Sequence, residues 1–356
     1  MKKGKTSISS IVVPLISILL ALLVGAVIMI ALGADPILAM QMLLKGAFGT
    51  KGGIGTTLAK ATPLMFCALC ACFAYKCGVF NLGGEGQFII GSIAGYTVAY
   101  SSGLTGCAGI LLSLIAGTAA GGIWGLIPAI LKITRGQNEM IISIMLNYVA
   151  TLFMGVIYTS WLRDENVPQT PMIPDAVKIS KVVPGMRFTW ALIIALATGL
   201  LVYLFLYHTS EGFRMRAVGL NMIASRFNGF HVRKYILVSF VVSGAIAGLG
   251  GSAEILGTQF RLINGYGAGY GFDGVAIALI GQLHPIAAMI AAVFFAALRA
   301  GSTSMQAATG VPTSVSDIIQ ALVIVFSVAG MALVRLPEFE ALRFRFGRKE
   351  EKGGRK

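Results

Sequence analysis

The chain has 356 residues, of which 56% are apolar and only 12% are charged, and its mean hydropathy is +0.83. A soluble domain carries roughly 45–50% apolar and about 25% charged residues, so this composition excludes an ordinary soluble protein and predicts an integral membrane protein. The formal net charge is +14. Lysine and arginine gathered on the cytoplasmic face explain this charge without a nucleic-acid partner.

Apolar runs of about 20 residues predict a polytopic, all-α membrane fold, because a helix of that length crosses the hydrocarbon core and satisfies its own backbone. Ten spans are predicted, at 11–32, 57–75, 79–100, 108–131, 139–162, 189–208, 236–257, 271–283, 285–300 and 317–334. The first run is too long for the apolar core of a signal peptide, so we interpret it as an uncleaved span.

The distribution of lysine and arginine orients these spans, because cytoplasmic segments carry the excess of both. The best fit places both termini in the cytoplasm of a cell-membrane protein. The predicted parts are a cytoplasmic N-terminus (1–10), a transmembrane permease domain (11–334), an extracellular loop (163–188), a cytoplasmic loop (209–235) and a cytoplasmic basic tail (335–356).

Three cysteines fall in the second predicted span, where Cys67 and Cys70 have the spacing of some metal and redox sites. Within a transmembrane helix, we interpret Cys67, Cys70 and Cys72 as small residues at a close helix contact. No metal site is predicted.

The stretch VFNLGGEGQF, from Val79 to Phe88, places Asn81 and Glu85 among glycines just after the second span. Because Lys76 marks the cytoplasmic end of that span, both side chains are expected at the inner mouth. A carboxylate at the start of a helix is favoured by free N–H groups and by the helix dipole. Two interpretations stay open, namely that Glu85 caps a buried turn or that it lines a cytoplasmic gate.

The cytoplasmic loop 209–235 contains apolar residues near helical spacing with cations between them. This pattern predicts a short amphipathic helix that docks into a partner protein or rests on the lipid surface. The apolar or small positions are Ala217, Val218, Met222, Ile223 and Phe227, and the cations are Arg214, Arg216 and Arg226.

A second acidic stretch, YGFDGVAIALIG, carries Phe272 and Asp273 and resembles the order Phe80-Asn81 followed by an apolar run. Spans 2 to 5 and 7 to 10 are therefore predicted to form an inverted repeat, with these turns as constrictions on opposite membrane faces. Glu254 and Asp317 are further acidic residues near or within predicted spans. They either hold helices together by hydrogen bonds or line the transport path.

Nucleotide hydrolysis by this chain is not expected, because the sequence lacks the G-x-x-x-x-G-K-[ST] phosphate loop. His208, His231 and His284 stand singly at predicted span ends, so no catalytic cluster is predicted. The chain is therefore expected to be a transport component and not an enzyme.

Four stretches together resemble membrane permeases of ABC importers in the simple-sugar and nucleoside class. They are VFNLGGEGQFIIG at Val79, NEMIISIMLNYVA at Asn138, AVGLNMIASRFNGF at Ala217 and GYGFDGVAIALIG at Gly269. The resemblance implies a cobalamin-importer-like, type II fold with about ten helices and two permease chains around a central path. It also implies ABC ATPase subunits that use ATP and Mg, with no cofactor in this chain, and an extracellular solute-binding protein.

In the family that it resembles, the stretch from Ala217 to Phe230 is the coupling helix that docks on the ATPase. Met222 stands where a proline is usual, and Ser225 where an alanine is usual. The matching positions in this chain are Ala217, Gly219, Asn221, Ala224, Arg226 and Gly229.

The Asn138 stretch is more similar to the longer member of a pair of nucleoside permeases than to sugar permeases. That resemblance implies a heterodimer with a second, similar permease, while a homodimer stays open. Arg163, Lys178, Lys181 and Arg187 either help dock the binding protein or are solvated loop charges.

The predicted function is inward transport of a nucleoside-like solute by alternating access, with ATP hydrolysed by a partner. A simple sugar or a flavin is an alternative cargo. A second alternative is a carrier driven by an ion gradient, with Glu85, Asp273 or Glu254 as its coupling acid. The residues that contact the cargo are not predicted.

Overall fold

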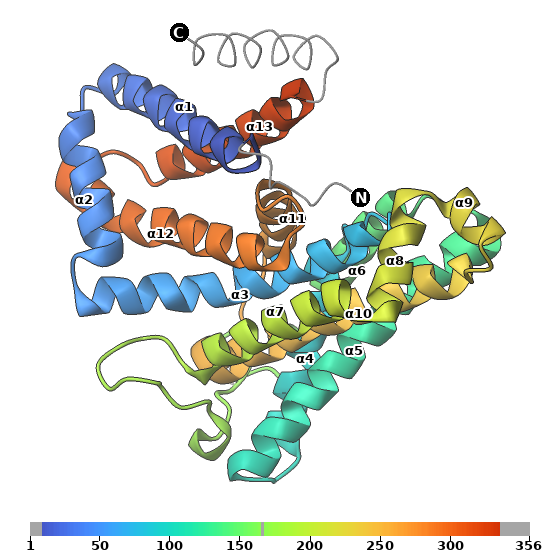
Figure 1. Ribbon diagram of the computed structural model, residues 1–356. Coiled ribbons are helices and arrows are strands. Elements are labelled where there is room, and N and C mark those ends of the chain that lie inside the picture. Colours follow the sequence, from blue (N-terminus) through green and yellow to red (C-terminus); the bar gives the residue numbers. More distant parts are fainter. Residues whose placement is uncertain (1–8, 165–166, 335–356) are drawn as a thin grey trace, which may run out of the picture. The chain divides into compact units, whose positions relative to one another are not determined.

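The computed structural model describes residues 9–164 and 167–334, which are mostly helical (Figure 1). The predicted basic tail (335–356) and most of the predicted N-terminal segment lie outside the described residues. The α-helices are α1 (Ser9–Ala31), α2 (Pro36–Phe48), α3 (Lys51–Lys76), α4 (Gly84–Ser101), α5 (Gly106–Arg135), α6 (Glu139–Val156), α7 (Trp190–His208), α8 (Ser210–Leu220), α9 (Met222–Phe227), α10 (Val232–Glu254), α11 (Tyr270–Ile280), α12 (Pro285–Thr309) and α13 (Ser314–Val334). Shorter turns are the π-helices η1 (Ile157–Trp161) and η3 (Ile255–Gln259) and the 3₁₀-helix η2 (Asp175–Val177).

Among the described residues, seven helices are long and apolar enough to cross a membrane, so the chain is an all-α, multi-pass membrane protein. Every predicted span contains a helix, but α11 has only 11 residues and is too short to cross alone. The sequence analysis missed α2, a 13-residue helix between the first two predicted spans. The count of ten spans stays a prediction.

The chain divides into two compact units. One comprises residues 1–42 and 302–356, where α1 packs along α13 and Gly25 lies against Ile319. The other comprises residues 43–301 and contains Glu85, Asp273 and the stretch from Ala217 to Phe230.

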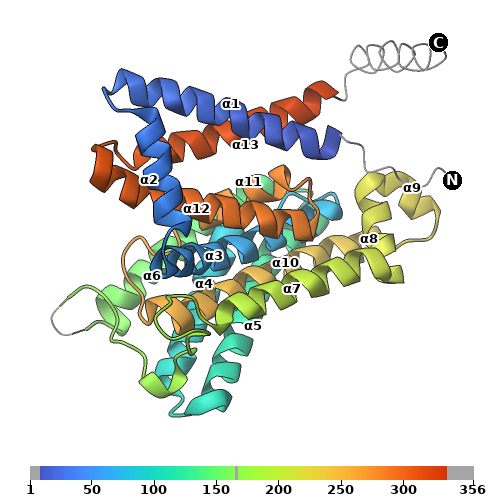
Figure 2. The same ribbon diagram turned by 60° about the vertical axis from the view of Figure 1, so that its left-hand side comes forward.

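Close backbone contacts hold α4, α5 and α10 together in the larger unit (Figure 2). A Cβ added to Gly91 would lie 2.3 Å from the Cα of Gly248, and one added to Gly248 would lie 2.3 Å from the carbonyl oxygen of Gly117. Small residues let transmembrane helices approach this closely and gain packing energy. Helix α3 is the most buried of the seven long apolar helices, since 89% of its most apolar stretch is buried.

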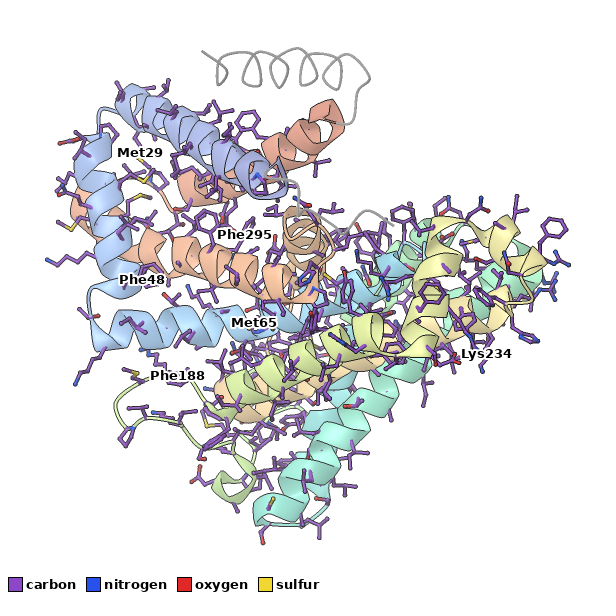
Figure 3. The ribbon with its side chains drawn as sticks, viewed as in Figure 1. Met29, Phe48, Met65, Phe188, Lys234 and Phe295 are labelled. Carbon is purple, nitrogen blue, oxygen red and sulfur yellow. The ribbon has the colours of Figure 1, made fainter. Side chains whose placement is uncertain are left out.

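The larger unit has two distinct ends, and segments predicted on the same membrane face meet at each end. At one end, a Cβ on Gly219 of α8 would lie 2.2 Å from the carbonyl oxygen of Lys76. At the other, Gly55 of α3 lies against Arg187, and the Tyr96 hydroxyl donates to the Pro171 carbonyl at 2.7 Å. Figure 3 shows Lys234 and Phe188 at these opposite ends.

The predicted outer loop is irregular, as its prolines indicate, yet backbone hydrogen bonds attach it to η3 and the segment that follows. Ile179 N–H donates to the Leu256 carbonyl at 2.8 Å, and Ile173 N–H donates to the Phe260 carbonyl at 3.0 Å. In addition, a short bridge pairs Lys181 with Thr189. The loop is therefore connected to the far end of α10.

We expect Gly248→Ala to destabilise the protein, because the added methyl cannot fit beside Gly117 and Gly121. Overpacking of this kind costs about 1–3 kcal/mol. Thermal unfolding in detergent should show a lower Tm. The control is Gly155→Ala in α6, where the nearest atom to the new methyl is the Tyr158 hydroxyl at 3.9 Å. Equal Tm values for the two variants would contradict the packing described here.

Candidate functional site

The chain between α3 and α4 folds back along α3 and buries Asn81, which is 1% exposed. The Asn81 amide donates to the Ser243 hydroxyl at 2.8 Å and to the Gln87 side-chain oxygen at 3.0 Å. Its own oxygen accepts from Gly83 N–H at 3.0 Å. These bonds join the connection between α3 and α4 to α4 and α10, and give Asn81 partners inside the helix packing.

The start of α4 is capped by a residue from another helix. Asn147 of α6 accepts from Gly86 N–H at 2.8 Å and donates to the Leu82 carbonyl at 2.9 Å. Both groups would otherwise be unpaired at a buried helix start. The sequence analysis missed Asn147, although an amide in the middle of an apolar span is a usable signal.

Glu85 caps the start of α11, which lies far along the chain. Its carboxylate accepts from Gly269 N–H at 3.0 Å, and Gly269 precedes α11 with a left-handed φ of 82°. A Cβ on Gly271 would lie 2.4 Å from the Glu85 nitrogen, so the two helix starts are in contact. The negative charge sits where both helix dipoles are positive.

Asp273, in the first turn of α11, forms an ion pair with Arg299 of α12. The Lys60 ammonium of α3 donates to the Arg299 backbone carbonyl at 2.9 Å. Ionisable groups inside membrane helices are usually paired in this way or face a watery cavity. The neighbouring Phe272 ring is 48% exposed, so the cluster reaches an open face of the larger unit.

These contacts overturn the prediction that the two acidic stretches lie on opposite membrane faces. Glu85 touches the residues that lead into Asp273, so both stretches lie together. Glu85 also lies deeper than the inner mouth, because Gly274, one turn along α11, packs on Cys67. Cys67 is nine residues before the end of α3, which is about 13.5 Å of helix.

The three cysteines of α3 are buried free thiols. A Cβ on Gly274 would lie 2.5 Å from the Cys67 Cβ, so Cys67 stands at a close contact between α3 and α11. Cys70 contacts the Asn81 amide at 3.8 Å.

The other two acids lie in different surroundings. Glu254 is 3% exposed at the end of α10, directly before the π-helix η3. Asp317 is exposed in the first turn of α13, in the smaller unit.

The segment matching the coupling helix is two helices, and the prediction of one helix is wrong. α8 ends at Leu220 and α9 begins at Met222, while the Asn221 side chain accepts from Ala224 N–H at 2.9 Å. Asn221 is thus the N-cap of α9, and Met222 occupies the first helical position, where proline is favoured. Gly229, with a φ of 80°, follows the end of α9.

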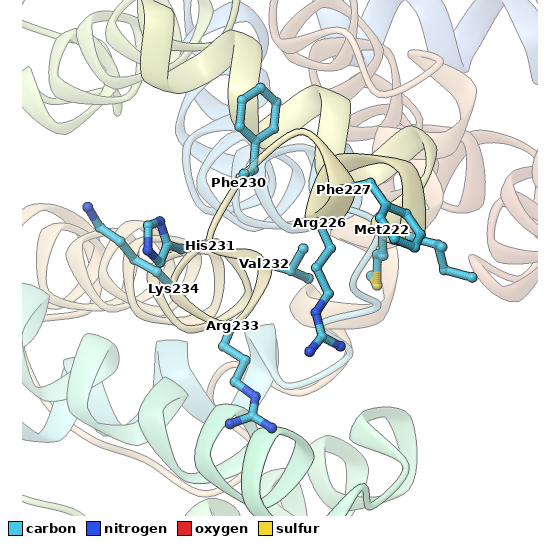
Figure 4. A pocket seen from close by; sticks show the side chains of 10 residues that line it. Met222, Arg226, Phe227, Phe230, His231, Val232, Arg233 and Lys234 are labelled. Atoms are coloured by element: carbon cyan, nitrogen blue, oxygen red, sulfur yellow. The ribbon is translucent and has the colours of Figure 1, made fainter.

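Helix α9 and its borders present apolar side chains outward. Leu220 is 89% exposed, Ile223 is 72% exposed and Phe227 is 89% exposed. We call these three residues with the exposed Arg226 the α9 surface. Beside it lies an open hollow of about 1140 Å³. Figure 4 shows Arg226 and Arg233 extending to the same side of this hollow.

Helix α8 is attached firmly to the rest of the larger unit. Glu211 pairs with Arg214 at 2.6 Å and accepts from the Tyr235 hydroxyl of α10 at 2.8 Å. The hydrogen bond from Tyr235 holds the pKa of the Glu211 carboxyl below its usual value, and the Arg214 charge adds to this effect. Glu211 therefore stays ionised at neutral pH.

The residues predicted as coupling positions lie at one end of the larger unit, along α8, α9 and the turn that follows. Ala217 and Gly219 lie on α8, and Gly219 makes the contact with Lys76 described above. Ala224 and Arg226 lie on α9, and both are exposed.

A family model described as the permease component of branched-chain amino acid transport systems matches residues 53–328 of this chain. The chain is 34% identical over 352 residues to the guanosine ABC transporter permease protein of Bacillus subtilis, covering 97% of this chain and 98% of that protein. It is 33% identical to the nucleoside ABC transporter permease protein of Lactococcus lactis, covering 94% and 95%. It is also 34% identical to the glucose ABC transporter permease protein of Haloferax volcanii, covering 88% and 86%.

We expect Glu85→Ala to destabilise the protein and Glu85→Gln to leave it nearly unchanged. Glutamine keeps an oxygen that can accept from Gly269 N–H, whereas alanine leaves this N–H without its partner. A buried unpaired group costs about 1–3 kcal/mol. Thermal unfolding in detergent measures the difference. An equal loss of Tm in both variants would mean that the charge, and not the cap, is what the fold requires.

Proposed function

The chain belongs to the family of permease components of branched-chain amino acid transport systems, and we propose that it is the membrane permease of an ABC importer that carries a nucleoside into the cell. It is a transport component and not an enzyme. The observation that carries the proposal is the α9 surface, which has the chemistry of a protein-docking element.

The α9 surface fits a protein groove better than it fits lipid. Phe227 and Ile223 project from a six-residue helix at the end of the larger unit, with Arg226 between them and Arg233 and Lys234 nearby. Exposed aromatic and arginine side chains are the residues that dominate protein interfaces. The partner is an ABC ATPase, which binds ATP and Mg, so no cofactor is needed in this chain.

A nucleoside is the proposed cargo because the guanosine and nucleoside permeases align with nearly the whole of this chain and of themselves. The glucose permease matches a smaller share of both chains, which makes a simple sugar the second candidate. A flavin would use the same machinery. A carrier driven by an ion gradient has no need of a docking surface such as the α9 surface.

The meeting point of α4 and α11 is the proposed gate of the path. Phe272 supplies an exposed ring, and Asp273 and Glu85 hold the start of α11 in place. Asn81 anchors the neighbouring start of α4. Movement of α11 away from Glu85 would break one hydrogen bond and alter the surface that carries Phe272.

The proposed assembly pairs this chain with a second, similar permease in a type II fold of ten spans, with both termini in the cytoplasm. The loop 163–188, at the end opposite the α9 surface, is the proposed docking site of an extracellular binding protein.

Uptake into proteoliposomes tests the function directly. The permease, reconstituted with its second permease, ATPase and binding protein, should accumulate labelled guanosine when ATP is supplied on the ATPase side. Labelled ribose and glucose should accumulate much less. Uptake that survives without ATP and collapses with a protonophore would refute the proposal in favour of an ion-driven carrier.

Substitutions on the α9 surface test the docking role. Phe227→Ala and Arg226→Glu should each weaken ATPase pull-down by about thirtyfold or more, since removal of an interface anchor costs about 2 kcal/mol or more. The matched control is Arg163→Glu, which reverses an exposed charge at the opposite end of the unit. Unchanged pull-down in both α9 variants would exclude this surface as the docking site.

A further inference from the structure

A cluster of aromatic rings joins the end of α7 to the turn between α11 and α12. Tyr207 and His284 have ring centroids 5.4 Å apart, and Tyr203 lies 5.5 Å from His284. Tyr203 also contacts Tyr207 at 5.3 Å and His208 at 5.5 Å. Tilted and edge-to-face ring pairs at these distances contribute about 0.5–1.5 kcal/mol each beyond area burial.

The same cluster reaches α8. The guanidinium carbon of Arg216 lies 4.8 Å from the Tyr207 ring centroid, a cation–π contact. Tyr207 therefore contacts both Arg216 of α8 and His284. A Cβ on Gly212 would lie 2.0 Å from the Phe205 carbonyl oxygen, so α8 cannot shift freely over the end of α7.

The turn that presents His284 has an unusual backbone. Gln282 and Leu283 both adopt left-handed conformations, with φ of 53° and 57°. Such angles are uncommon outside glycine, and each residue held there carries strain that the surrounding structure must maintain. Gly281 packs on α12, since its Cβ would lie 2.6 Å from the Ala288 nitrogen. The turn is thus tightly defined, and His284 packs it against the end of α7 through Tyr203 and Tyr207.

Helix α11 connects this turn to the proposed gate. Its 11 residues span about 16 Å, from Ile280 beside the turn to Tyr270 beside Glu85. A short helix moves as a rigid element, so a displacement at one end appears at the other. The contacts therefore run without interruption from Arg216 through Tyr207 and His284 to the hydrogen bond between Gly269 and Glu85.

We propose that Tyr207 and His284 are positioning residues that transmit movement of α8 to α11, and so couple ATPase closure to the gate at Glu85. The inference rests on the proposed importer function and adds residues outside both candidate sites. Binding of the ATPase to α9 would move α8, Arg216 would displace Tyr207, and the strained turn would carry the displacement into α11.

The charge state of His284 agrees with packing as a neutral ring. Burial lowers the pKa of the His284 imidazole, and the Lys76 ammonium lowers it further. Arg216 and His208 are the other cationic or titratable groups at the cluster, beside the two tyrosines. A neutral imidazole packs against the Tyr203 and Tyr207 rings without repelling the Arg216 guanidinium.

The test measures the amount of labelled guanosine transported per ATP hydrolysed in the reconstituted complex. Tyr207→Ala and His284→Ala should lower guanosine transported per ATP hydrolysed by at least tenfold. ATPase pull-down and ATP hydrolysis should stay within twofold of the unaltered complex. Tyr207→Phe, which keeps the ring, should retain the ratio. Leu204→Ala is the matched control, because Leu204 lies on the same helix and is 42% exposed.

Arg216→Gln provides a variant that keeps part of the aliphatic stem and removes the guanidinium above Tyr207. We expect its transport ratio to fall about threefold. The proposed role of Tyr207 and His284 is refuted when the unaltered complex transports guanosine and these variants transport as much guanosine per ATP hydrolysed. It is also refuted when transport and hydrolysis fall in parallel with pull-down. Absence of ATP-driven uptake in the unaltered complex would instead refute the proposed function.

Discussion

An interrupted helix inside a membrane protein must find partners for its free backbone groups, and the larger unit is organised around that requirement. Water is absent from the hydrocarbon region, so each unpaired N–H costs several kcal/mol. Asn147 supplies both partners at the start of α4, and Glu85 supplies one at the start of α11. Because these side chains come from other helices, the caps also fix which helices are neighbours.

The two kinds of helix contact in this unit have different consequences for movement. Glycines bring α4, α5 and α10 into backbone contact, which leaves no room for sliding without a clash. Helix α11 begins at a carboxylate hydrogen bond and an ion pair, which can break and re-form with other partners. The start of α11 is therefore held by polar contacts that can exchange partners, whereas its middle packs on α3 at Gly274 as closely as α4, α5 and α10 pack on one another.

Much of the fold could be predicted from the sequence because apolar run length and cation placement report directly on the membrane. The segments placed on one face do meet, as Gly219 with Lys76 and Gly55 with Arg187 illustrate. The same logic failed for Asp273, because charge counting assigns a face to each span end and cannot recognise a helix that begins beside the middle of another. The contacts of Asn147, Tyr207 and His284 were not predicted for a different reason. Their partners are distant in sequence, and no local pattern identifies such contacts. The break at Asn221 was readable in principle, since asparagine is a preferred N-cap.

The division of the coupling segment into α8 and α9 separates two tasks that one continuous helix would combine. α8 is fixed to α3 by Gly219 and to α10 by the bond between Glu211 and Tyr235. α9 is held mainly by its own cap at Asn221 and by the chain on either side, so Ile223 and Phe227 remain exposed. A partner bound to α9 therefore acts on α8, which is anchored, and a displacement of α8 reaches α3, α7 and α10 together. Of these three helices, α3 packs on the middle of α11 at Gly274, whereas α7 leads through Tyr207 to the turn at His284. Because Arg216 of α8 lies over the Tyr207 ring, the end of α7 is where α8 connects to the turn that precedes α12 and follows α11.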